Sequence, residues 1–179
     1  STRADFPFVA CNLVYEDTKE HLFNPYVIIN SNNKKIGVLG IVPSLNDIVL
    51  GSNIEGIEIE PEIESLDKWV KELKDKKVDA IILLSSLGVP WDRENYYHDF
   101  LKNINNRNIN DAKELNSLSL GYYAKDIDFI ISGGISKGYK TPWYDKNSHV
   151  FIFQNYGNGT EFGHFKLNYD KTNKHFIGY

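Results

Sequence analysis

Apolar and polar positions along this chain predict alternating strands and helices. Residues 36–42 (IGVLGIV) and 79–84 (DAIILL) are almost continuously apolar. Runs of this length indicate strands that are buried on both faces of a sheet. Residues 61–77 lie between them and predict a helix, because their apolar side chains recur at helical spacing: Ile63, Leu66, Val70 and Leu73.

The remaining segments complete an α/β pattern. Residues 26–29 and 36–42 flank the polar turn NSNNKK, which favours a hairpin. Residues 91–125 are predicted to be helical in two pieces, and IDFIISGG at 127–134 another buried strand. The GNG at 157–159 predicts a closing hairpin. We therefore expect a single domain over residues 1–179, with a mostly parallel sheet, flanking helices and a C-terminal antiparallel hairpin.

Composition excludes several classes of protein. The formal net charge is −4 and the basic residues are dispersed, which argues against a nucleic-acid partner. No apolar run approaches the roughly 20 residues of a transmembrane helix. There is no methionine, so we expect Ser1 to follow processing or truncation. The lone Cys11 lies among apolar residues, which favours a buried thiol over a reactive one.

Two strand ends are candidates for chemistry, since sites of open α/β sheets gather at the carboxyl ends of strands. These ends are LLSSLG at residues 83–88 and ISGGISK at 131–137. Neither end carries a His, Cys, Asp or Glu. The sequence therefore offers no good metal ligand and no good general base at either place.

Five segments in order resemble the calcineurin-like metallophosphatases, and the 5′-nucleotidase branch in particular. Members of the family typically have the motif LSHLG followed by IDxIIGGHSH, where this chain has LSSLG and IDFIISGGISK. The segments FPFVACNL, KKIGVLGIV and VFIFQNYGNGTEFGHFKLNYD also fit the family pattern. The resemblance implies the second half of an αββα sandwich in which two similar halves face each other and hold two metal ions.

The departures from this family concern its metal ligands. The Asp-x-His, Gly-Asp and Asn-His motifs of the first half are absent. The three histidines of the second half correspond by position to Ser86, Ile135 and Lys137. A serine hydroxyl is a weak ligand, isoleucine is none, and an ammonium group repels a cation. We therefore predict no metal, no cofactor and no catalytic residue in this chain.

Several functions remain open at this stage. The first is a non-catalytic relative of the nucleotidases, retained for binding or assembly and, by resemblance, exported. A second copy or a partner chain would then cover a sheet face left without its other half. One alternative is a piece of a split nucleotidase that another chain completes. A further alternative is a metal-independent module that binds a nucleotide or a carbohydrate.

Two groups of residues are candidate binding sites. An anion would suit Lys137 beside the N–H groups of Gly133 and Gly134, although Lys137 can equally be an exposed loop lysine. An aromatic rim follows the two strand ends, where rings either stack on a ligand or pack over the sheet. The residues of this rim are Trp91, Tyr139, Trp143 and Tyr144.

Overall fold

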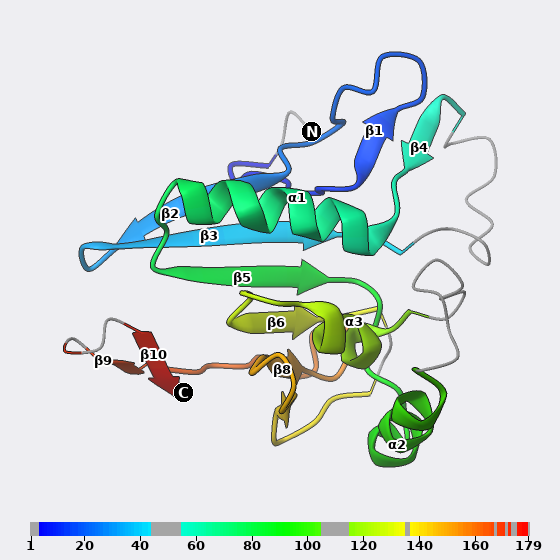
Figure 1. Cartoon of the computed structure of the whole chain (residues 1–179), viewed down its shortest axis with the longest axis vertical. Coiled ribbons are helices and arrows are strands. Elements are labelled where there is room, and N and C mark those ends of the chain that lie inside the picture. Colours follow the sequence, from blue (N-terminus) through cyan, green and yellow to red (C-terminus); the bar gives the residue numbers. More distant parts are fainter. Residues whose placement is uncertain are drawn as a thin grey trace.

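A six-stranded sheet forms the centre of the molecule (Figure 1), in the order β2-β3-β5-β6-β8-β7. The computed structural model describes residues 4–43, 55–104, 115–134, 137–166, 168–170, 172 and 175–178. The four inner strands are parallel, and they are β3 (Lys34–Ile41), β5 (Ala80–Ser85), β6 (Phe129–Ser132) and β8 (Phe151–Gln154). The edge strands β2 (Tyr26–Ser31) and β7 (Trp143–Tyr144) are antiparallel to their neighbours. The predicted α/β class with a mostly parallel sheet is confirmed.

Within the described residues, three helices connect the strands, and each begins at a favourable residue. Helix α1 (Glu62–Asp75) follows Pro61 and carries two glutamates in its first turn, which suit the positive end of the helix. Helix α2 (Arg93–Asn103) is capped by the carboxylate of Asp92. Helix α3 (Ser117–Tyr123) begins at Asn116 with a capping box. None of the helices in the described ranges has the length and apolar character of a membrane span.

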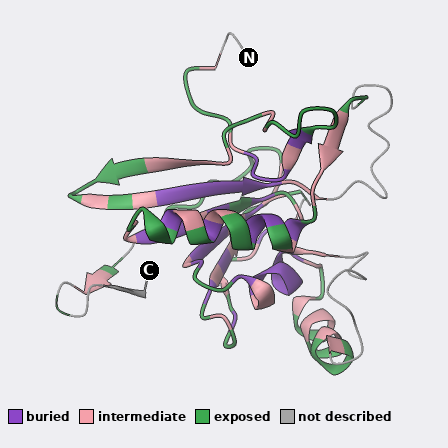
Figure 2. Ribbon diagram, turned by 45° about the horizontal axis from the view of Figure 1, so that its top comes forward, coloured by how far each residue is buried: buried purple, intermediate pink, exposed green. Residues whose placement is uncertain are grey.

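Helices α1 and α3 cover the same face of the sheet (Figure 1). The strand register aligns one apolar side chain from each inner strand on this covered face. Leucines from both helices complete the core, and Figure 2 shows the buried stripe of α1 against the sheet. The aligned strand residues are Leu39, Leu83, Ile130 and Ile152, and all are buried.

The other face of the sheet is only partly covered. We call it the open face, and it carries Ile29, Ile82, Leu84, Ile131 and Phe153. Leu84 is 38% exposed and Ile29 is 50% exposed. The prediction that residues 79–84 are buried on both faces is therefore wrong for β5. Its apolar run arises from one covered face and one open face, which periodicity alone does not distinguish.

The hairpin predicted around 157–159 is also corrected. Strand β8 already has β6 and β7 as neighbours, so no edge remains for a returning strand. The chain instead turns at 157–160 and crosses the open face, where the ring of Phe165 stacks on Phe153 at 4.6 Å. The C-terminal hairpin forms later, between β9 (Asn168–Asp170) and β10 (His175–Gly178). A second small sheet joins β1 (Leu13–Tyr15) to β4 (Ile57–Ile59).

Cys11 is a buried thiol, as the sequence predicts. Its backbone N–H donates to the carbonyl of Gly40 at 2.7 Å, which extends the sheet edge beyond the start of β2. Burial raises the pKa of the thiol to about 12, so the nucleophilic thiolate is scarce at neutral pH.

Adjacent leucines of β5 test this one-sided architecture. We expect Leu83→Ala to lower the free energy of unfolding by about 2–5 kcal/mol, because it opens a cavity in the covered core. Leu84→Ala should cost less than about 1 kcal/mol, because its side chain is partly in water already. Urea denaturation of both variants measures the difference. Equal losses would show that the open face is packed in solution.

Candidate functional site

The two strand ends singled out in the sequence lie in contact. The N–H of Gly133 donates to the carbonyl of Ser85 at 2.8 Å. A Cβ on Gly134 would lie 2.0 Å from the carbonyl oxygen of Ser86, and the φ of Gly134 is +102°. Only glycine tolerates both conditions. The Gly-Gly turn therefore allows the loop after β6 to pass directly against the loop after β5.

A row of buried polar side chains lies beneath these loops. The Oγ of Ser85 is 3.1 Å from that of Ser117, which is 2.7 Å from that of Ser132. Ser132 donates to Oε1 of Gln154 at 2.8 Å. Each hydroxyl has a single proton, so Ser117 donates to Ser132 and Ser85 donates to Ser117. The N–H of Leu87 donates to Ser85, which gives the row one direction of donation.

Gln154 links the loops after β5 and β6. Its Oε1 also accepts the N–H of Val89 at 2.8 Å, and its Nε2 donates to the carbonyl of Lys137. Sequence analysis missed this residue. The available signal was a polar residue at the end of each of three apolar strands, in AIILLS, FIIS and FIFQ.

The residues that correspond by resemblance to the family's ligands offer no imidazole for a two-metal centre. Ser86 is exposed, and its Oγ donates to the carbonyl of Ile41 at 3.4 Å. Ile135 lies outside the described residues. Lys137 is half-buried and cationic. Within the ranges that the structure describes, no three His, Cys, Asp or Glu side chains are grouped closely enough to hold a metal ion.

Lys137 joins the two loops through its side chain. Its Nζ donates to the carbonyl of Trp91 at 2.6 Å, and it lies 5.3 Å and 4.9 Å from the ring centres of Trp91 and Tyr139. Gly133 does not supply the free N–H expected for an anion, because Ser85 accepts it. The anion-binding prediction is corrected at this residue and then rests on Gly134 and Lys137.

The structure brings together three of the four predicted rim aromatics. The guanidinium of Arg93 lies 4.4 Å from the ring of Tyr139 and 5.7 Å from that of Trp143, so cations alternate with rings. Trp91, at the end of this row, is 66% exposed. Tyr144 is elsewhere. Successive residues of β7 face opposite sides of the sheet, so the Tyr144 ring points away from the Trp143 ring. The centre of the Tyr144 ring lies 4.7 Å from that of Phe151.

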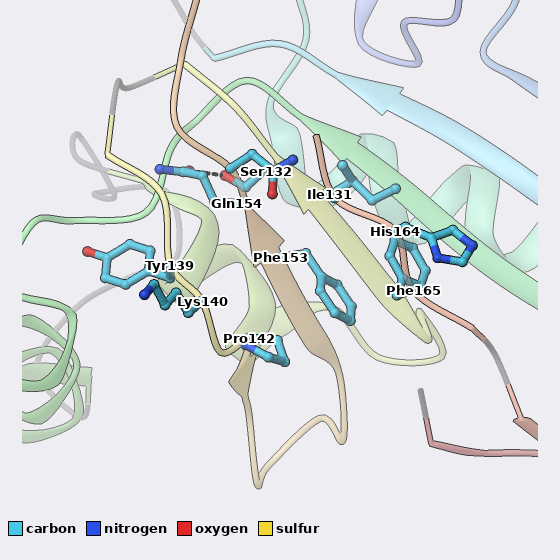
Figure 3. A pocket seen from close by; sticks show the side chains of 11 residues that line it. Ile131, Ser132, Tyr139, Lys140, Pro142, Phe153, Gln154, His164 and Phe165 are labelled. Carbon is cyan, nitrogen blue, oxygen red and sulfur yellow. Dashed lines mark hydrogen bonds between the residues drawn. The ribbon is translucent and has the colours of Figure 1, made fainter. Parts of the chain in front are cut away.

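A pocket of about 300 Å³ opens beside this row (Figure 3). The loop after β6 forms one wall, and the segment after β8 forms the opposite wall. The ends of β6 and β8 lie between them. The lining residues are Ile131, Ser132, Tyr139, Lys140, Pro142, Phe153, Gln154, Asn155, Gly163, His164 and Phe165.

Several known proteins with similar sequences are nucleotidases by name. The chain is 32% identical over 96 residues to a 2′,3′-cyclic-nucleotide 2′-phosphodiesterase/3′-nucleotidase of Haemophilus influenzae, covering 48% of this chain and 15% of that protein. The chain is a relative of the 5′-nucleotidase-type metallophosphatases. This relationship extends over about half of its length. No family model matches the chain.

Two further comparisons concern a cell wall protein and the fold. A cell wall protein of Listeria monocytogenes is 31% identical over 86 residues, covering 46% of this chain and 11% of that protein. The solved 5′-nucleotidase precursor of Thermus thermophilus superposes with a TM-score of 0.64 at 18% identity, covering 99% of this chain and 33% of that structure. The chain thus spans a minor part of the length of the proteins it matches.

The role of Gln154 can be tested against its neighbour. Gln154→Leu leaves the N–H of Val89 and the carbonyl of Lys137 without this partner, so we expect the free energy of unfolding to fall by about 2–4 kcal/mol. Asn155→Leu is the matched control, because Asn155 is exposed and should change stability by less than about 1 kcal/mol. Thermal and urea unfolding measure both. A stable Gln154→Leu variant would contradict the proposed linkage of the two loops.

Proposed function

We propose that this chain is a degenerate, non-catalytic 5′-nucleotidase-like domain, retained for binding or for assembly with a partner. The observation that carries the proposal is the arrangement of Lys137. This residue corresponds by resemblance to a metal-binding histidine, and its ammonium is held against the carbonyl of Trp91. A positive charge at this place opposes the approach of a divalent cation.

The chemistry of the family supports the same conclusion. Two metal ions about 3.5–4 Å apart orient a phosphate ester and generate the hydroxide that attacks it. Ser86 and Lys137 offer a weak ligand and a cation in place of two imidazoles. We derive no hydrolytic step from these side chains.

The open face supports a role in assembly. Its five defining side chains are apolar and uncharged, and two of them are substantially exposed. A second copy of the chain or a partner polypeptide would remove this surface from water, which is favourable in proportion to the apolar area buried. The relationship to a cell wall protein supports export, which we include in the proposal.

An activity assay tests the absence of catalysis. We expect no metal-dependent hydrolysis of p-nitrophenyl phosphate or AMP by the purified chain with zinc, manganese or magnesium. The reason is the loss of imidazole ligands at Ser86 and Lys137. Turnover at about 1 per second or more that persists after repurification would contradict the proposal. Turnover only in the presence of a co-purifying polypeptide would favour the split nucleotidase instead.

Sedimentation velocity tests assembly through the open face. We expect the chain to self-associate at micromolar concentration, or otherwise to bind a hydrophobic dye there. Leu84→Glu should abolish both effects, because a carboxylate on an apolar face resists desolvation. Leu101→Glu is the control, since Leu101 is 40% exposed but lies on α2. A monomer that binds no dye would show that the chain covers this face by itself.

A further inference from the structure

We propose that the pocket between the loop after β6 and the segment after β8 binds a small anion with a flat apolar body, such as an aromatic carboxylate. The proposal goes beyond the function above. It does not depend on the loss of hydrolysis.

The floor of the pocket suits a flat apolar group. Ile131 and Phe153 are paired across β6 and β8, and the Phe165 ring stacks on Phe153 with an interplanar angle of 9°. Pro142 lies on the opposite wall (Figure 3). The stacked rings offer a flat apolar wall against which another aromatic ring can pack.

The volume of the pocket limits the size of the ligand. Engineered apolar cavities of about 150 Å³ hold benzene. A pocket of about 300 Å³ has room for a benzene ring and a short acidic side chain. This volume is at the small end of natural ligand pockets, which favours a ligand smaller than a nucleotide.

The polar groups of the pocket divide into two sets. Those on the inner wall are already used, because Ser132 and Gln154 hydrogen-bond to each other and Tyr139 donates to the carbonyl of Pro90. The outer set comprises the side chains of Lys140, Asn155 and His164. These three have no hydrogen-bond partner within the described part of the chain, and all three are exposed.

The charge of the outer set indicates the sign of the ligand. No lining residue is an Asp or a Glu, whereas Lys140 is cationic. This local composition is opposite to the net charge of the chain, which is −4. Hydrogen bonds from Lys140 and Asn155 can therefore receive a carboxylate at the mouth while its apolar body lies on the phenylalanine floor.

Ligand titration of the whole chain tests the proposal, with phenylacetate as the probe. We expect saturable binding with a Kd of about 1 mM or tighter, followed by calorimetry or by amide shifts around Phe153 and Phe165. Phenylacetamide has the same shape without the charge, and it should bind about threefold to tenfold more weakly. Absence of saturation at about 10 mM phenylacetate, or equal binding of the amide, would overturn the proposal.

Matched lysine variants locate the binding site. Lys140→Gln should reduce the affinity for phenylacetate about threefold or more and leave that for phenylacetamide unchanged. Lys146→Gln removes an exposed lysine outside the pocket and should change neither. Phe153→Leu should weaken both ligands, and its unfolding curve shows whether the fold is intact. Equal effects of the two lysine substitutions would place binding outside the pocket and overturn the assignment.

Discussion

The register of the four parallel strands is the constraint on which the rest of the structure depends. It places Leu39, Leu83, Ile130 and Ile152 in one row, and helices α1 and α3 bury that row. Because side chains alternate along a strand, the same register places the next residues on the open face. A shift by one residue would exchange the two faces and leave the helices without a core.

The same register also builds the site. Ser85, Ser132 and Gln154 are neighbours at the carboxyl ends of three strands. Burying these polar side chains costs the least free energy when each of them has a hydrogen-bond partner. The single direction of donation along this row satisfies each hydroxyl in turn. Gln154 then fixes the backbone of both loops at Val89 and Lys137. Hydrogen bonds of the buried Gln154 side chain thus hold the loops after β5 and β6 in place.

Sequence reasoning succeeds where one local pattern decides the outcome. Apolar runs locate the inner strands, and helical spacing locates α1. It fails where the outcome depends on distant neighbours. The segment around 157–159 has the pattern of a hairpin, but β6 and β7 occupy both edges of β8. Tyr144 follows Trp143 directly, yet the alternation of β7 sends it to the other face.

Lys137 shows why the sequence predicts only part of the candidate site. By resemblance, Lys137 stands where the family has a metal-binding histidine, and an ammonium group is a poor ligand for a cation. Only the structure shows what the ammonium does instead, which is to bridge the loop of Trp91 and the ring of Tyr139. A metal ion binds ligands from separate loops at one point. The ammonium of Lys137 likewise contacts the carbonyl and ring of Trp91 and the ring of Tyr139. The two loops are therefore held together here by a fixed charge.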